Sequence, residues 1–369
     1  MRRMHPRVVV AMATAALILA ACGTESADPA PVPTPAPAPA PAPTEPGEPT
    51  LPEPETKQVI VGASGSGISQ LAWIEAIERL NAQGWEIQYV EAGSNLNQQG
   101  VDSGQFDFGL GSTPAALRIL NEGRRTLTHI MDLVELDWAA YGVKSVEVEV
   151  DGVATTKSLD SLCDFDGEQF AVHSFSSITY VLPAYFVSSN CFTVKPDWLI
   201  VPGSDNRLVA LLNGDILAST LELADAIALE AEDTEGRFQR IITFADSVNV
   251  IGSAVSVNAD FAATNPGTVM NMMAEVLLVS REMNAGPAEF KTIMLKHLPE
   301  YGGFSGLDEI VEEYAERQML SSNGGFAVDK IEESLRFYSQ SGIVGPELTV
   351  DDVADRSFLE QVLEIIGEA

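Results

Sequence analysis

Buried strands and helices alternate along the chain from Lys57 onward, and this alternation restricts the fold more than any other feature of the sequence. The expected strands cover 59–63, 86–90, 106–110 and 127–134, and the expected helices cover 68–83, 95–103 and 114–123. Consecutive strand-helix units form a parallel sheet with right-handed crossovers. The first part of the folded chain is therefore predicted to be an α/β unit.

A second run of the same kind follows, and then a helical tail. The expected strands cover 169–174, 198–201, 216–221, 238–244 and 253–257, and the expected helices begin at 177, 206, 265, 307, 328 and near 358. The tail has no sheet of its own, so it must pack on an earlier unit. We therefore predict two lobes joined by a two-segment hinge, with lobe 1 at 57–145 and 249–369 and lobe 2 at 146–248.

The stretch 106–117, FDFGLGSTPAAL, predicts a strand that turns directly into a helix. Thr113 is expected at the N-cap and Pro114 at the first helical position, where proline is favoured. The next amides, those of Ala115 and Ala116, have no partner within a helix and face the carboxyl end of the strand. Ligands bind at that edge of an open α/β sheet, so we expect a binding loop here.

Four other predicted strands end in similar loops of small polar residues. These loops cover 63–67, 93–95, 174–177 and 203–206. Each one alone could simply provide a helix N-cap. Together, at the same end of successive strands, they predict a cleft rich in hydrogen-bond donors that holds a small polar molecule.

Two glycine-rich motifs of enzymes are incomplete in this chain. Residues 62–69, GASGSGIS, have the glycine spacing of a phosphate loop, but Ile68 occupies the position of the required lysine. Ser66 occupies the position of the second glycine of a hydrolase elbow. These departures argue against nucleotide binding and against a serine hydrolase.

The histidines show no metal-binding spacing. His129, His173 and His297 are far apart in the sequence, whereas zinc sites bring ligands together at short spacings. His173 ends a strand beside the predicted cleft, where it is either a ligand contact or a structural residue. We expect no catalytic residue, no metal site and no cofactor.

The amino terminus is predicted to be a targeting segment. Residues 1–21 have a basic start and a short apolar run, which is typical of a secretory signal peptide. The following sequence, Leu-Ala-Ala-Cys ending at Cys22, resembles a bacterial lipobox, so Cys22 is the expected lipidation site. An ordinary signal peptide with an incidental cysteine is the alternative.

Residues 22–56 are expected to form a tether. They contain twelve of the 21 prolines, mostly as alternating Ala-Pro. Such a segment favours extended polyproline II and reaches on the order of 100 Å at ~3.1 Å per residue.

The chain is strongly acidic. Its formal charge of −32 becomes −35 without residues 1–21, which hold three arginines and no acids. This field opposes binding to nucleic acid and to anionic lipid surfaces, and it favours a monomer. Membrane attachment is therefore expected only through a lipid at Cys22.

Two cysteines remain if Cys22 is acylated. Cys163 and Cys191 are predicted to form a disulfide in an oxidising compartment. Closing this loop of about 30 residues stabilises a fold by roughly 3 kcal/mol. The alternative is two small buried thiols.

Four phrases carry a family resemblance, and they lie at 102–117, 161–179, 207–226 and 349–367. By these phrases the chain resembles the bacterial substrate-binding lipoproteins of ABC importers. The group is that of the nitrate, taurine, aliphatic-sulfonate and thiamine-precursor binding proteins. The resemblance implies a type II periplasmic-binding-protein fold, in which each lobe is a mostly parallel sheet flanked by helices and the helical tail packs on lobe 1.

The resemblance also implies the residues that contact a ligand at the hinge cleft. They are Ser64, Gly65, Ser66, Ser94, Asn95, Ser112, Thr113, Ser176, Ser177 and the turn 221–224, which contains Glu222. The polar loop at 203–206 adds Asn206 and the following Arg207 to the predicted site. Many members have a proline after the equivalent of Glu222, whereas this chain has Leu223. The implied partners are a small solute and the permease and ATPase subunits of an ABC importer. The implied location of this protein is outside the cytoplasm, at the cell membrane.

Two other functions remain open within the resemblance. One is a sensor ectodomain, and the other is an enzyme like the thiamine-pyrimidine synthases, which need a reactive histidine and an iron site. For the ligand, Arg207 is the only basic residue in the predicted loops, while Glu222 and Asp225 are acidic. This balance favours a neutral or zwitterionic organic solute stacked on Phe175 or Trp138, with a sulfonate or another oxyanion as the alternative.

Overall fold

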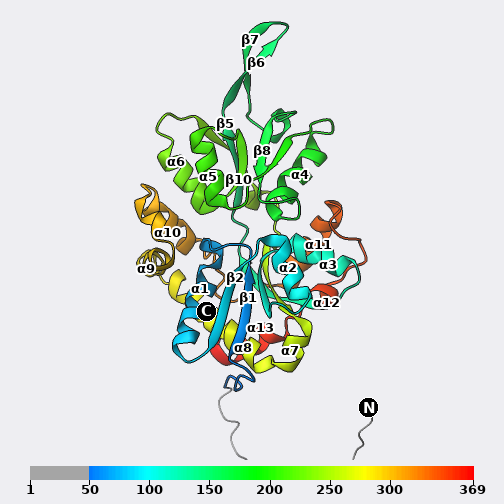
Figure 1. Cartoon of the computed structure of the whole chain (residues 1–369), viewed down its shortest axis with the longest axis vertical. Coiled ribbons are helices and arrows are strands. Elements are labelled where there is room, and N and C mark those ends of the chain that lie inside the picture. Colours follow the sequence, from blue (N-terminus) through cyan, green and yellow to red (C-terminus); the bar gives the residue numbers. More distant parts are fainter. Residues whose placement is uncertain (1–49) are drawn as a thin grey trace, which may run out of the picture. The chain divides into compact units, whose positions relative to one another are not determined.

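The computed structural model describes residues 50–369, which form two five-stranded sheets flanked by helices (Figure 1). The expected signal peptide, the lipidation site at Cys22 and most of the expected tether lie outside the described residues. No helix in the described part of the chain is long and apolar enough to cross a membrane.

The first sheet has the strand order β2-β1-β3-β12-β4. Its strands are β1 (Gln58–Ala63), β2 (Glu86–Glu91), β3 (Phe108–Ser112), β4 (Leu127–Val134) and β12 (Ser253–Asn258). The helices between them are η1 (Ile68–Gln70), α1 (Leu71–Ala82), α2 (Ser94–Asp102) and α3 (Thr113–Asn121). Helix α1 buries Trp73, Ile77 and Leu80, as its 3.6-residue periodicity predicts. Strand β12 runs antiparallel to both of its neighbours, while β1, β2 and β3 are parallel.

The second sheet has the order β11-β5-β10-β8-β9. Its strands are β5 (Trp138–Val143), β8 (Gln169–Val172), β9 (Asp197–Ile200), β10 (Ala218–Glu222) and β11 (Phe238–Thr243). Its helices are α4 (Ile178–Asn190), α5 (Ser204–Asn213) and α6 (Leu223–Glu232). Strand β5 is antiparallel to β10 and β11, whereas β8, β9 and β10 are parallel.

The chain passes between the two sheets twice. The first passage joins β4 to β5, and the second joins β11 to β12 through η3 (Phe244–Asp246). The strand after each passage, β5 or β12, runs antiparallel to both of its neighbours in the sheet. The lobe boundaries remain a prediction. Strand β5 precedes the predicted boundary at residue 146 but belongs to the second sheet.

Strands β6 (Ser145–Val150) and β7 (Val153–Ser158) pair as a separate antiparallel hairpin that the sequence analysis did not predict. In Figure 1 the hairpin extends away from the second sheet beyond β5. Most of β7 is exposed, so this hairpin contributes little to the core.

The tail after β12 is helical, as predicted. It consists of α7 (Ala259–Thr264), α8 (Pro266–Asn284), α9 (Pro287–His297), η4 (Pro299–Gly303), α10 (Leu307–Glu316), α11 (Val328–Gln340), α12 (Val350–Val353) and α13 (Ser357–Ile366). Helix α8 packs against α1 and α13, while α10 packs against α8, α9 and also α6. The tail therefore covers the first sheet and reaches the second lobe through α10.

The last residues of the expected tether bind the folded unit. The carboxylate of Glu55 accepts hydrogen bonds from the amides of Gly267 (3.1 Å) and Thr268 (2.9 Å), in the first turn of α8. The Thr268 hydroxyl donates to the carbonyl of Thr56 at 2.9 Å. Glu55 therefore satisfies amides at the helix start that have no partner within the helix.

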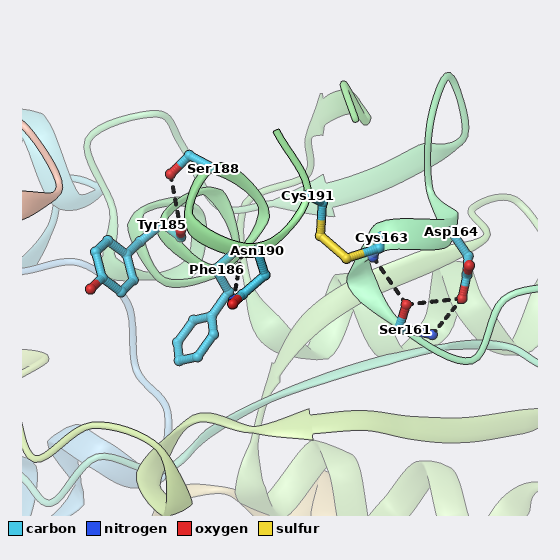
Figure 2. Close-up of a disulfide and its surroundings, with 8 residues drawn as sticks. All are labelled: Ser161, Cys163, Asp164, Tyr185, Phe186, Ser188, Asn190 and Cys191. Carbon is cyan, nitrogen blue, oxygen red and sulfur yellow. Dashed lines mark hydrogen bonds between the residues drawn. A yellow bond between two sulfur atoms is a disulfide. The ribbon is translucent and has the colours of Figure 1, made fainter. Parts of the chain in front are cut away.

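The predicted disulfide between Cys163 and Cys191 is confirmed (Figure 2). Cys163 lies in η2 (Leu162–Asp164), and Cys191 directly follows α4. The two Cα atoms are 5.3 Å apart, within the usual range for a disulfide. The bond fixes the carboxyl end of α4 against the segment that leads into β8.

Candidate functional site

Loops from both sheets surround one cavity of about 770 Å³. The first sheet contributes the loops that follow β1 and β2 and the end of β3. The second sheet contributes the loops that follow β8 and β9 and the end of β10. These are the carboxyl ends of parallel strands, where open α/β folds place their ligands.

All but two of the predicted site residues line this cavity. Those that line it are Ser64, Gly65, Ser66, Ser94, Asn95, Ser112, Ser177, Asn206, Arg207 and Glu222. Thr113 and Ser176 do not belong to the lining. Thr113 is buried and its amide donates to the carbonyl of Gly252 at 3.0 Å. The Ser176 hydroxyl lies 3.2 Å from that of Ser174.

The N-cap of α3 is Ser112, and the prediction of Thr113 is wrong by one residue. Strand β3 continues further than expected because Gly111 and Ser112 pair with Ala254 and Ser253 of β12. The Ser112 hydroxyl makes no bond to its own helix. It accepts a hydrogen bond from the amide of Ile178, the first residue of α4, at 2.9 Å. A side chain of the first sheet thus caps a helix of the second lobe.

Glu222 makes the reverse connection. It is the last residue of β10, and its Oε1 accepts hydrogen bonds from the amide of Ser69 (3.2 Å) and from the Ser69 hydroxyl. Ser69 lies in η1, at the start of the helix that follows β1. Glu222 is only 5% exposed, and its burial raises its pKa. The neighbouring Asp137 also has a raised pKa, because of its burial and because of the charge of Glu222.

Arg207 is 1% exposed and gives its donors to the backbone. Its Nε donates to the carbonyl of Thr220 at 2.9 Å, and its Nη1 donates to those of Val201 (3.0 Å) and Gly203 (2.8 Å). Burial lowers its pKa to about 10, although nearby carboxylates oppose this shift. The guanidinium therefore holds the β9-α5 loop against β10.

Asp225, in the first turn of α6, is a buried carboxyl on the cavity wall. Its Oδ1 accepts a hydrogen bond from the Tyr301 hydroxyl at 3.0 Å. Its Oδ2 has no hydrogen-bond partner among the described residues, although the side chain is 1% exposed. Burial, and then the charge of Glu222, raise the pKa of Asp225 to about 7.

His173 lines the cavity as a neutral side chain. Its Nδ1 accepts a hydrogen bond from the amide of Gly203 at 3.3 Å. Burial and the charge of Arg207 lower its pKa to about 4. This hydrogen bond holds the Gly203 loop in place. It agrees with the expectation that His173 is a structural residue.

Several lining residues were missed by the sequence analysis. Glu300 and Tyr301 come from η4 in the tail, and Ser253 begins β12. A strand that runs antiparallel to its neighbours starts at the edge of the sheet where those neighbours end. The predicted strand at 253–257 could therefore have placed Ser253 at the cavity. No local pattern indicates Tyr301, whose contact with Asp225 spans 76 positions in the chain.

The apolar part of the wall includes Trp138, and Phe175 does not belong to it. Phe175 packs instead on Tyr180, with ring centroids 5.1 Å apart. Leu96 and Ile200 also line the cavity although they are exposed large hydrophobic residues. The expectation of stacking on Phe175 is therefore wrong, and that for Trp138 stays a prediction.

One group of potential metal ligands is formed within residues 50–369, away from the cavity. It consists of Glu75, Glu78 and His297, whose ligand atoms lie within 4.8 Å of one another. The Lys296 ammonium lies 2.8 Å from carboxylate oxygens of both Glu75 and Glu78. The Arg79 guanidinium is also paired with Glu75, at 2.9 Å. These cations make the group an ion-pair network between α1 and α9.

No protein-family model and no curated protein sequence matches this chain. The periplasmic nitrate-binding protein NrtA from Synechocystis PCC 6803 is similar in structure, with a TM-score of 0.63 and 11% identity over 85% of this chain and 90% of that one. The ligand-binding component of an ABC-type import system from Staphylococcus aureus, with zinc bound, has a TM-score of 0.60 and 13% identity over 83% of this chain and 98% of that one. The periplasmic aliphatic sulphonate binding protein SsuA from Escherichia coli has a TM-score of 0.56 and 13% identity over 82% of this chain and 92% of that one.

Identities this low carry the fold and not the ligand. The two sheets, their passages and the tail agree with the architecture that the resemblance implied. The chain has the two-lobed α/β fold of the periplasmic binding proteins.

Proposed function

We propose that this protein is an extracytoplasmic solute-binding component of an ABC importer. It captures a small polar organic solute in the cavity between the lobes and delivers it to a membrane permease. The observation that carries the proposal is the cavity of about 770 Å³, which is lined by strand ends of both sheets. A site of this volume, with polar loops around it, suits a small ligand.

The proposed mechanism is capture by closure of the lobes. Within residues 50–369 the chain crosses between the sheets only at the β4-β5 and β11-β12 passages, which suit a hinge. Ligand first binds one lobe, and the other lobe then adds contacts and excludes water. The bonds from Ile178 to Ser112 and from Ser69 to Glu222 are contacts that closure of this kind would form.

The proposal includes attachment through a lipid at Cys22 and a tether over residues 22–56. The alternatives are an oxyanion binder, a sensor ectodomain and an enzyme. The fold neighbours with a printed ligand bind nitrate, sulphonate or zinc, but the cavity wall of this chain is more acidic than an oxyanion favours. We propose a binder and not an enzyme because the buried acids of the wall hold structural hydrogen bonds.

The test is native mass spectrometry of the full-length protein, purified from its own host membranes without denaturation. We expect a bound small molecule that denaturation releases intact. Uptake of that compound by cells should require both this protein and a permease. Release of a chemically altered product would support the enzyme instead, and uptake that is unchanged without this protein would contradict the importer.

A further inference from the structure

Carboxylates dominate the charged groups of the cavity wall. Among the described residues the charged lining consists of Glu91, Asp205, Arg207, Glu222, Asp225 and Glu300. Glu222 and Asp225 are buried, whereas Glu91, Asp205 and Glu300 are exposed. A cleft lined by one sign of charge attracts ligands of the opposite sign.

The single guanidinium of the wall does not balance these acids for an anionic ligand. Arg207 gives three of its N–H donors to the carbonyls of Val201, Gly203 and Thr220, and a guanidinium has five such donors. The side chain is also 1% exposed. Two donors remain, but the side chain is almost fully buried, so a ligand anion has little access to this cation.

Two of the helix starts at the cavity are occupied by the protein itself, whereas those of α2 and α5 have no side-chain cap. Helix N-termini attract anions through their free amides. At η1 the Ser69 amide donates to the carboxylate of Glu222. At α4 the Ile178 amide donates to the hydroxyl of Ser112. Both donors are therefore used across the lobe interface.

The wall instead lacks a donor at Asp225. Its Oδ2 is buried and has no hydrogen-bond partner among the described residues. Leaving a buried polar oxygen unpaired is costly, and more so for a charged one. The other oxygen of this carboxylate is satisfied by Tyr301. Burial raises the pKa of the carboxylate, and the nearby Ser204 hydroxyl opposes this shift but makes no hydrogen bond to Oδ2.

We propose that the cavity selects a small organic cation whose N–H donors bind Asp225 and Glu222. This inference rests on the proposed function, because it names the class of solute that the cavity takes. An ammonium or amidinium group supplies both the missing donor and the missing positive charge. Leu96, Trp138 and Ile200 provide apolar surface for the organic body of the ligand.

The test is a thermal-shift series with probes that share a body and differ in charge. One set is benzamidine, benzamide and benzenesulfonate, and a second is butylamine, butanol and butanesulfonate. Nitrate and the chlorides of sodium, magnesium, calcium and zinc complete the panel. We expect only organic cations to raise the melting temperature, since ligand binding to the native state stabilises it.

Variants then assign the effect to the proposed residues. Asp225→Asn and Glu222→Gln should weaken binding of the active cation by about 30-fold or more, because each removes a buried charge partner. Asp225→Asn removes an unfavourable buried charge, so it should remain folded. Glu312→Gln makes the same charge change on the exposed side of α10 and should bind as the wild type does.

A block of the cavity separates failure of this inference from failure of the proposed function. A Cβ at Gly65 meets no atom within 4 Å, so Gly65→Trp fills open space on the cavity wall. If sulfonates, nitrate, neutral probes or metal ions bind and Gly65→Trp abolishes that binding, the cation inference is overturned and the proposed function stands. If no probe binds, the compound recovered from the native protein is tested instead. A cationic compound supports the inference, and a neutral or anionic one overturns it while the proposed function stands. Absence of any bound compound would overturn both.

Discussion

Glu222 accepts a hydrogen bond from the amide of Ser69 at 3.2 Å, across the interface between the two lobes. The carboxylate comes from the end of β10, and the amide belongs to the helix start after β1. The interaction places a negative charge at the position where a helix start attracts one. It therefore joins the two lobes at the wall of the cavity.

Ser69→Ala should lower the free energy of unfolding of the ligand-free protein by about 1–3 kcal/mol. The variant removes the hydroxyl that donates to the buried Glu222 carboxylate, and bonds to charged groups contribute in this range. Urea denaturation measures the change. Ser66→Ala is the matched control, because its hydroxyl bonds to Glu91 on the exposed surface, and we expect a change within ~0.5 kcal/mol. Equal effects of the two variants would contradict the role of Ser69.

Asp225→Asn should flatten the dependence of stability on pH. Asp225 faces Glu222, Ser204, Tyr301 and Arg207, and its pKa is raised from 3.8 to about 7, mainly by burial. Between these values the native state holds a proton that the unfolded chain has lost. Stability therefore falls as pH rises through this window, by ~1.4 kcal/mol per pH unit for this group.

Urea titrations at several pH values between about 4 and 7 measure this slope. Subtracting the variant curve from the wild-type curve removes the contributions of Asp132 and Asp137, which titrate in both proteins, and leaves that of Asp225 with its coupling to Glu222. Parallel curves for the two proteins would show that Asp225 ionises normally in the native state.

The Cys163–Cys191 disulfide should contribute roughly 3 kcal/mol to the free energy of unfolding, because it closes a loop in the unfolded chain. Substituting both cysteines by serine, with the wild type in reductant as a comparison, gives the value. The two forms should lose equal stability. A loss in the variant alone would indicate a packing effect of serine instead of the cross-link.

Glu55→Ala should destabilise the folded unit by about 1 kcal/mol, because the carboxylate caps the start of α8. Burial alone would raise the pKa of Glu55, but bonds from Thr268 and Gly267 lower it overall. The capping contribution should therefore be lost in acid. The nearby Glu53→Ala serves as the control. Identical stability of wild type and Glu55→Ala would mean that this segment detaches in solution.

The first sheet was predicted almost completely, because its helices and strands are specified by local periodicity and capping residues. Helix α1 shows this, since Trp73, Ile77 and Leu80 follow the spacing of one helix face and are buried. Strand β5 was not predicted. Its six residues become a strand through antiparallel pairing with β10 and β11, which are far away in the sequence.

The same distinction applies to the candidate site. The polar loops at 64–66 and 94–95 were predicted, because residues that cap helices after strands form a local pattern. Arg207 was assigned to the site, but its bonds to backbone carbonyls depend on how β9 and β10 pack. The reciprocal caps of Ser69 and Ile178 also depend on tertiary structure, since each joins the two lobes.

The central claim is that the cavity between the lobes binds one small solute. Isothermal titration calorimetry of the compound recovered from the native protein tests it most directly, with the wild type, Gly65→Trp and Gly303→Trp. A Cβ at Gly303 also meets no atom within 4 Å, but this residue does not line the cavity. We predict one binding site in the wild type and in Gly303→Trp, and binding at least about tenfold weaker in Gly65→Trp. Unchanged affinity in Gly65→Trp would contradict the account.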